Sequence, residues 1–390
     1  MQNTATPDPL DLLWFCQLAA DGEFIGTKPE RRPTLNYIAN LVETASEMGF
    51  SSLLTATNFH AEHEAWTASV ATLARTQGAG LLIAVRPGMF HPALFAKMVA
   101  TAANLFPGRV RINVVTGSNP TENAMYGDME NHAERYARTR EFIAIMRDLW
   151  RGVPVNSDSP RYPFKGSIVS PVPAQPVPIY VGGHSDDAQR ISAELADVYL
   201  VWGDTIAGIE ARLATMRAHE ANTARVATTP LRYGLRCHVV VRETEAEAWA
   251  AADRLISRID PAVREKFIEA SVAVDSEGQR RQQALAASSS LVVEENLWAG
   301  VGLARSGVGV AIVGNPAQVA AKLRAYQALG ISTFILSGYP HLEECRRFGE
   351  MVMPLLRDAR GKGAAANVAA AVVKGAAPRA GLATGVAPVT

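Results

Sequence analysis

Residues 81–115 read LLIAVRPGMFHPALFAKMVATAANLFPGRVRINVV, two short apolar runs separated by a longer amphipathic segment. Leu81–Arg86 and Val110–Val115 are apolar and rich in β-branched residues, as strands buried on both faces are. Pro92–Leu105, between them, has the apolar spacing of a helix. This order of strand, helix and strand predicts one unit of a parallel sheet.

The same alternation runs from Leu12 to Pro354. Strands are predicted at Leu12–Leu18, Ser52–Thr57, Leu81–Arg86, Val110–Val115, Ile179–Val181, Val198–Trp202, Tyr233–Val241 and Phe334–Ser337. Helices are predicted at Tyr37–Met48, Trp66–Thr76, Pro92–Leu105, Ala133–Trp150, Asp186–Leu195, Ile206–His219, Glu245–Arg258, Ala317–Leu329 and Glu343–Leu356. Eight strands with intervening helices favour a closed α/β fold, the (β/α)₈ TIM barrel, over an open doubly wound sheet. No G-x-G-x-x-G motif follows a strand and no P-loop occurs, so a nucleotide-binding open sheet loses its main support.

Composition and charge narrow the functional class. The 390 residues include 38 Lys and Arg and 38 Asp and Glu, a formal net charge of zero, which argues against a nucleic-acid or anionic-membrane binder. Apolar residues make up 48% and charged residues 19%, which predicts a globular fold. Cys16, Cys237 and Cys345 are odd in number and widely spaced, which fits a reducing compartment. Met1–Leu10 lacks the features of a secretory signal and no apolar run is long enough to span a membrane, so we expect a cytoplasmic protein.

Two insertions interrupt the single barrel domain, which we expect to span residues 11–358. Residues 152–178 hold seven prolines and a predicted hairpin around Arg161–Val169. Residues 260–308 lie between the seventh and eighth strands. Within them Ser271–Ser290 is polar and lacks apolar periodicity, which predicts a mobile loop that acts as a lid over a pocket.

Both ends of the chain are expected to lack fixed structure. Residues 1–10 are polar and contain proline, which predicts a flexible N-terminus. Residues 361–390 consist mostly of Ala, Gly, Val and Pro with almost no charge, which predicts a disordered tail.

Polar side chains gather at the C-terminal ends of the predicted strands, where barrel enzymes place their active sites. They are Asn58–Glu64, Arg86, Thr116–Asn119, Gly182–Ser185, Trp202, Arg236, His238, Tyr339 and His341. The sequence therefore predicts a functional site at this end of the barrel.

Two groups among these residues have more than one interpretation. His60, Glu62, His63 and Glu64 are possible metal ligands, but without a clear third histidine a solvated loop or substrate contacts are favoured. Arg236 and His238 share one face of a strand, because the strand period is two residues. A buried arginine is costly without an anion, so this pair predicts either an anionic ligand or a structural ion pair.

Two glycine-containing turns after neighbouring strands suggest a phosphate site. Gly182-Gly183-His184-Ser185 is a strand-to-helix turn whose amides and hydroxyl suit a phosphate at a helix N-terminus. Thr116-Gly117-Ser118 has the same character. Each is also compatible with an ordinary turn, but together they indicate one cofactor that carries a phosphate.

Six longer motifs together resemble the flavin-dependent monooxygenases of the bacterial luciferase-like superfamily, and within it the alkanesulfonate monooxygenases. The resemblance covers the chain from about Leu12 to Leu356. The motifs are Asn113–Ser118, His132–Tyr136, Tyr180–Asp186, Arg236–Thr244, Asn296–Leu303 and Leu336–Glu344.

The resemblance implies a luciferase-like barrel that binds FMN at the strand ends. By matching positions, the residues that would hold the flavin and its phosphate are Thr116, Gly117, His132, Tyr136, Gly183 and Ser185. Those that would form the catalytic end, where the sulfonate and oxygen meet, are Arg236, His238, Arg305, Tyr339 and His341. No metal is implied.

The resemblance also implies a reaction and its partners. A separate NAD(P)H-dependent flavin reductase supplies reduced FMN, which reacts with dioxygen, and the oxygenated flavin attacks the sulfur of a small organosulfonate. Carbon–sulfur cleavage then yields sulfite and an aldehyde, a route of sulfur assimilation. A base must take the α proton, and His238, His341 or the oxygenated flavin is favoured over a deprotonated arginine. Family members are commonly homodimers or homotetramers.

The chain departs from the family pattern at two places. Alkanesulfonate members carry a cysteine after the second strand and a histidine after the first, but the matching segments here are Asn58–Glu64 and Ala19–Gly22. A sulfone or sulfinate is therefore an alternative substrate. A metal-dependent hydrolase, a flavin carrier or sensor without oxygenase activity, and a deazaflavin-dependent dehydrogenase are the alternative functions.

Overall fold

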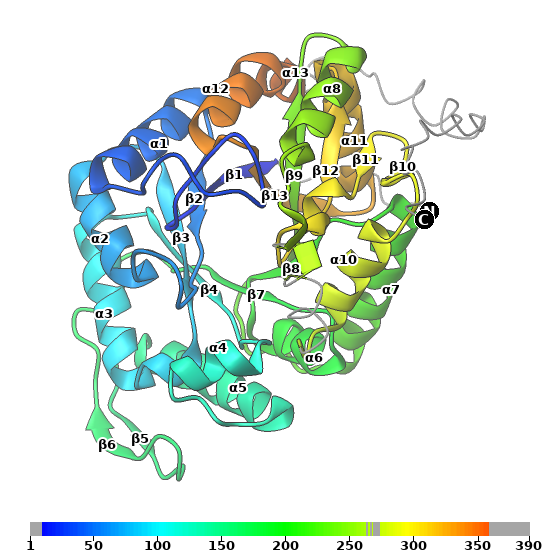
Figure 1. The fold of residues 1–390 in the computed structure, drawn as a ribbon. Coiled ribbons are helices and arrows are strands. Elements are labelled where there is room, and N and C mark those ends of the chain that lie inside the picture. The colour runs from blue at the N-terminus through cyan, green and yellow to red at the C-terminus, as the bar shows by residue number, and fades with distance from the viewer. Residues whose placement is uncertain (1–9, 263, 266, 268–273, 359–390) are drawn as a thin grey trace.

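The computed structural model describes residues 10–262, 264, 265, 267 and 274–358. Within these residues eight parallel strands close into a barrel surrounded by helices (Figure 1). The strands follow one another around the ring in chain order, and the ring closes where β8 pairs with β9. They are β1 (Asp11–Cys16), β2 (Ser52–Thr55), β3 (Gly80–Val85), β4 (Val110–Val114), β7 (Ile179–Gly182), β8 (Val198–Trp202), β9 (Arg232–Val241) and β13 (Ile331–Ser337). The predicted (β/α)₈ barrel is confirmed.

Helices pack on the outer face of the barrel and apolar side chains fill its interior. The helices between barrel strands are α1 (Leu35–Met48), α2 (Ala65–Arg75), α3 (Pro92–Leu105), α5 (His132–Leu149), α6 (Asp186–Leu195), α7 (Ile206–Asn222) and α11 (Pro316–Ala328), and α12 (His341–Met351) and α13 (Met353–Asp358) follow β13. Leu81 and Ile83 belong to the same core cluster as Phe95 of α3. Leu82, in the same strand, clusters instead with Leu13. Both faces of β3 are therefore buried, which explains its uninterrupted apolar sequence.

Several short elements differ from the prediction. Helix α4 (Pro120–Met125) was not predicted, because its six residues are too few to show periodicity. The hairpin lies earlier than predicted, between β5 (Val155–Ser157) and β6 (Phe164–Ser167). One helix predicted at Glu343–Leu356 is two, α12 and α13, separated at Val352. A 3₁₀ turn, η1 (Pro87–Met89), follows β3.

The insertion before the eighth barrel strand is more ordered than predicted. After α8 (Glu245–Ile256), the described part of the predicted loop Ser271–Ser290 contains a helix, α10 (Glu277–Ala286). The Ser276 hydroxyl accepts a hydrogen bond from the Gln279 amide and so caps this helix. Its buried face includes the glutamines Gln279 and Gln282, so the helix has no apolar stripe that a sequence pattern reveals.

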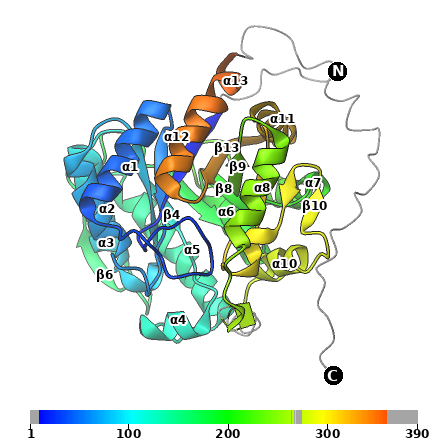
Figure 2. The ribbon, with the colours of Figure 1, turned by 45° about the horizontal axis from the view of Figure 1, so that its top comes forward.

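Strand β9 extends beyond the barrel and carries a small second sheet. Its first half pairs with β8, whereas His238–Val241 pair with β12 (Ala311–Gly314), a strand that was not predicted. Antiparallel pairing then adds β11 (Leu297–Trp298) and β10 (Val292–Glu294), and η2 (Gly300–Leu303) follows. The segment after β1, dark blue in Figures 1 and 2, crosses the barrel mouth, and the Ile25 amide in it donates to the Leu255 carbonyl of α8.

The predictions for the chain ends fall mainly on residues that the structure does not describe. Residues 1–9 and 361–390 lie outside the described residues, as do 271–273 of the predicted lid. In the described part of the chain, no helix combines the length and apolarity needed to cross a bilayer.

Candidate active site at the barrel mouth

Arg236 is a buried cation in the middle of β9, where this strand pairs with Trp202 at the C-terminal end of β8. Its guanidinium donates hydrogen bonds to the Cys237 carbonyl at 2.6 Å and the Ser337 hydroxyl at 2.8 Å, and it lies 4.7 Å from the centre of the Phe15 ring. Burial and the neighbouring charge of Arg305 lower the pKa of Arg236 to about 9. The side chain therefore remains positively charged at neutral pH.

Arg305 brings a second guanidinium to the same place from the segment after η2. It donates to His238 Nε2 at 3.1 Å and to the Tyr339 hydroxyl at 2.5 Å, and it also lies over the Phe15 ring, at 5.2 Å. Among the described residues, no carboxylate pairs with Arg236 or Arg305. The sequence allowed either an anionic ligand or a structural ion pair for Arg236. Among the described residues, no structural ion pair is formed with it.

His238 is held neutral between the two arginines. It is 1% exposed, and burial together with the charges of Arg236 and Arg305 lowers its pKa well below the ordinary value. Its Nε2 lies 3.1 Å from Arg305 Nη1, which can only donate, and 3.3 Å from the Val308 carbonyl, which can only accept. Its Nδ1 lies 2.7 Å from the Ser337 hydroxyl oxygen, which can either donate or accept.

His341 is held by a carboxylate on the opposite side of the site. Its Nδ1 lies 2.9 Å from Asp21 Oδ1, and its backbone amide donates to Asp21 Oδ2. Burial raises the pKa of Asp21, but His341 and the hydroxyl of Tyr37 outweigh it and lower the pKa to about 2. Nε2 of His341 is buried without a hydrogen-bond partner among the described residues. The ring packs edge-on against Tyr339 with centroids 4.8 Å apart.

Helix α10 positions the segment that carries Arg305. The Gly307 amide donates to Gln279 Oε1, and the Gly309 amide donates to Gln282 Oε1, both at 2.8 Å. Both glutamines are at most 4% exposed. Because they are three residues apart on α10, they face the same side and bind the backbone on either side of Val308.

The barrel in turn anchors α10. Asp204, just after β8, accepts two hydrogen bonds from Arg281 at 2.6 and 2.7 Å, and Gln282 Nε2 donates to the Gly203 carbonyl. The described part of the insertion is thus fixed to β8 at one side and to the Arg305 segment at the other.

The residues predicted to hold a phosphate form a second group, at the N-terminal ends of α5 and α6. Tyr136 hydrogen bonds with Ser185, and its ring lies 4.7 Å from that of His132. Ser185 caps α6 by accepting from the Ala188 amide. Gly183 has φ +148, and a Cβ there would lie 2.5 Å from Ala188 Cβ, so only glycine leaves this turn open.

Thr116 and Gly117 belong to the same group, on the loop after β4. The Thr116 hydroxyl lies 3.2 Å from that of Thr139, and the Gly117 carbonyl accepts from Arg135 Nε. Gly117 has φ +85, a conformation that favours glycine. The six predicted phosphate-side residues thus lie on the turns after β4 and β7 and on α5. Four of the five predicted catalytic residues lie on or directly after β9 and β13, and Arg305 reaches them from the segment after η2.

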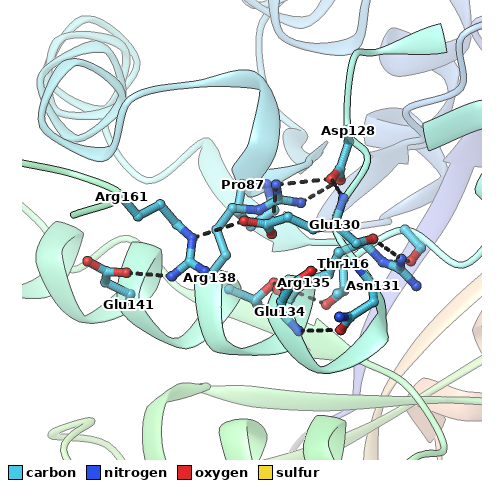
Figure 3. A network of polar contacts seen from close by, with 12 residues as sticks. Pro87, Thr116, Asp128, Glu130, Asn131, Glu134, Arg135, Arg138, Glu141 and Arg161 are labelled. Carbon is cyan, nitrogen blue, oxygen red and sulfur yellow. Dashed lines mark hydrogen bonds and ion pairs between the residues drawn. The ribbon is translucent and has the colours of Figure 1, made fainter. Parts of the chain in front are cut away.

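A network of ion pairs fixes α5 (Figure 3). Arg138, 7% exposed, pairs with Asp128 and Glu130, and Glu130 and Glu141 both pair with Arg161 next to the β5–β6 hairpin. Asn131 and Glu134 form a capping box at the start of the helix. The first insertion thus supports the helix that carries His132 and Tyr136.

Asp275 connects the second insertion to the phosphate-side group. Its carboxylate lies 2.7 Å from His132 Nδ1, and its amide donates to the Ser118 carbonyl. Asp275, two residues before the start of α10, therefore touches one group of the site, while α10 itself positions Arg305 in the other.

The residues weighed as metal ligands have other partners. His63 Nε2 lies 2.6 Å from the Pro33 carbonyl, Glu62 pairs with Arg32, and Glu64 caps α2. The His60 amide is held by Asn58. Over the described residues, no group of three His, Cys, Asp or Glu side chains is arranged to hold a metal ion.

Sequence reasoning missed part of this site. Asp21 was passed over because the segment Ala19–Gly22 was examined only for a histidine, although a polar residue after a barrel strand is itself a signal. Arg86 was noted, but its partners Glu122 and Asn123 lie on the unpredicted α4. No local pattern marks Gln279 and Gln282.

Comparisons with known proteins agree with the fold described above. The model of the family described as luciferase-like monooxygenase matches residues 11–333. Riboflavin lyase (RcaE), solved with modified FMN and riboflavin, is 18% identical with a TM-score of 0.73, covering 90% of this chain and 92% of that one. EDTA monooxygenase (EmoA) from Chelativorans sp. BNC1 is 18% identical with a TM-score of 0.72, covering 90% and 94%. An F420-dependent secondary alcohol dehydrogenase is 16% identical with a TM-score of 0.65, covering 90% and 100%.

At these identities the structures support the fold alone, whereas the family match rests on the sequence itself. That match begins at the first barrel strand and ends within the last. The chain belongs to the luciferase-like monooxygenase family.

Proposed function

We propose that this protein is a two-component monooxygenase that uses reduced FMN and dioxygen to cleave the carbon–sulfur bond of an alkanesulfonate, releasing an aldehyde and sulfite. One observation carries the choice of substrate: the guanidinium groups of the buried Arg236 and the half-buried Arg305 have no carboxylate partner among the described residues. Two neighbouring cations without a counter-ion, one of them buried, favour an anionic ligand. A separate NAD(P)H-dependent reductase would supply the reduced flavin.

The phosphate-side group fits FMN. Tyr136 and Ser185 offer hydroxyls, and Gly183 lets the turn after β7 pack closely on α6, since a Cβ there would meet Ala188. Thr116 and Gly117 would border the flavin on the β4 side, and His132 would meet the phosphate where Asp275 now contacts it. When bound, reduced FMN supplies the two electrons that activate dioxygen.

The five predicted catalytic residues, called the catalytic group below, supply charge and a base, and neighbouring segments shield them from water. Arg236 and Arg305 would bind the sulfonate and stabilise negative charge as the sulfur reacts. His341 is the base we favour for the α proton, because Asp21 takes Nδ1–H and leaves Nε2 as a lone pair. His238, by contrast, has both ring nitrogens engaged, Nε2 by Arg305 and the Val308 carbonyl and Nδ1 by Ser337. Helix α10 and the segment that carries Arg305 would cover this group and keep water out.

Sulfite release tests this proposal. Purified protein is supplied with a flavin reductase, NAD(P)H, FMN and oxygen, and alkanesulfonates are compared with a sulfone and a sulfinate. We expect sulfite that depends on both the enzyme and reduced FMN. Product from the sulfone or sulfinate alone would keep the cofactor and change the substrate. Hydride transfer from an alcohol to oxidised F420, or from reduced F420 to a ketone, would replace the reaction class.

A further inference from the structure

A cavity of about 350 Å³ lies beside the catalytic group, between β9, α8 and the loop after β13. His238 and Tyr339 form one of its walls, and both also bond Arg305. Val240 and Leu255 line it with apolar groups, and the small side chains of Ala250 and Ala251 line it on the α8 side. A cavity of this size is within the range that holds a small-molecule ligand.

The charges around this cavity are already paired. Arg242 pairs with Glu344, and Arg254 pairs with Glu23. These four residues contribute two positive and two negative charges, so the cavity offers no unpaired charge of its own to a ligand. In contrast, the nearby Arg236 and Arg305 lack carboxylates among the described residues.

We propose that this cavity binds the apolar chain of the substrate, with Ala250 and Ala251 setting the length and width that the enzyme accepts. This inference rests on the proposed function, because it takes the sulfonate group to lie at Arg236 and Arg305. The substrate class is an anion with an unbranched alkyl chain. Ala250 and Arg254 are exposed, so the cavity opens to solvent and a longer chain extends outward along α8.

Filling the cavity tests the inference. Ala251→Leu adds an isobutyl group inside it, and Ala250→Leu does the same from an exposed position where folding is unaffected. Ala246→Leu is the matched control, because Ala246 is exposed on α8 and does not line the cavity. Dissociation constants of octanesulfonate and ethanesulfonate are measured anaerobically on protein saturated with reduced FMN, alongside sulfite release.

Each buried methylene contributes to binding, so excluding two or three should weaken octanesulfonate binding about 15-fold to 50-fold in Ala251→Leu. Ethanesulfonate binding should change less than twofold, and Ala246→Leu should match wild type for both ligands. Unchanged octanesulfonate binding in Ala251→Leu and Ala250→Leu would overturn the inference even if sulfite is released. If the leucine variants weaken octanesulfonate binding but not ethanesulfonate binding, and wild type releases no sulfite, the cavity binds alkyl chains and the proposed reaction is wrong.

Discussion

His341 Nδ1 lies 2.9 Å from Asp21 Oδ1, although the two residues are 320 positions apart in the sequence. Both side chains are 1% exposed. The contact joins the segment after the first barrel strand to the helix after the last. It therefore ties the ends of the barrel together at the edge of the catalytic group.

Replacing Asp21 with Asn should make stability respond differently to pH. The pKa of Asp21 is lowered from 3.8 to about 2 in the folded protein, so its carboxylate stabilises the fold above about pH 4. That stability disappears as pH falls through about 2. We expect Asp21→Asn to lower the free energy of unfolding by about 2 kcal/mol at pH 7, with the difference shrinking between pH 4 and pH 2. Denaturant unfolding at several pH values measures this, and a difference independent of pH would contradict it.

Asp21→Asn should also slow turnover. An amide at position 21 no longer fixes the proton on His341 Nδ1, so we expect kcat to fall at least tenfold with KM nearly unchanged. Asp21→Glu should recover part of kcat. If Asp21 only supported the fold, kcat and the amount of folded protein would fall together and the pH profile of kcat would keep its shape.

Removing Arg305 should separate flavin oxidation from product formation. Arg305→Ala leaves Arg236 as the single described cation for the anion and removes the donor to Tyr339. We expect NAD(P)H and oxygen consumption to continue while sulfite per oxygen falls at least tenfold. A normal sulfite yield from this variant would exclude the role of Arg305.

Gln282 should matter for catalysis although it touches neither proposed ligand. Gln282→Ala leaves the Gly309 amide and the Gly203 carbonyl without this partner, which costs about 1–3 kcal/mol in stability. We also expect sulfite per oxygen to fall, because the Arg305 segment loses a support. Gln283→Ala is the matched control, since Gln283 Nε2 has no hydrogen-bond partner among the described residues. If sulfite per oxygen is equal in Gln282→Ala and Gln283→Ala, Gln282 does not position the Arg305 segment.

Gly183 should be required for flavin binding. A Cβ at this position meets Ala188 Cβ at 2.5 Å and approaches the Tyr136 hydroxyl at 3.4 Å. Gly183→Ala should therefore weaken reduced FMN binding at least tenfold in an anaerobic fluorescence titration. Gly127→Ala is a control for a methyl group at a glycine with positive φ, since Gly127 has φ +76 and nothing lies within 4 Å of its Cβ. If both variants bind reduced FMN more weakly, the cause is a methyl group at a positive φ and not the turn after β7.

The sequence predicted the barrel well because β3 and its neighbours are buried on both faces and carry continuous apolar runs. It also predicted that Arg236 and His238 share a face, because strand period alone decides this. It did not predict α10, whose buried side includes glutamines that bind backbone amides. Strand β12 was missed because four residues give too short a pattern.

The partners of the predicted site residues were harder to predict than the residues themselves. A strand-end position indicates that His341 faces the site, but its contact with Asp21 depends on how a loop folds over the barrel mouth. Likewise, the sequence left open whether a carboxylate pairs with Arg236. Such contacts join segments far apart in the chain, and local patterns carry no information about them.

The most direct test of the central claim is whether the arginine pair binds an anion. Octanesulfonate and methyl octyl sulfone have similar shapes but differ by one charge, so their dissociation constants are compared on wild type and Arg236→Met, each saturated with reduced FMN without oxygen. We predict that wild type binds the sulfonate at least tenfold more tightly than the sulfone, and that Arg236→Met loses most of this preference. Equal binding of the two ligands by wild type, or an undiminished preference in Arg236→Met, would contradict the account.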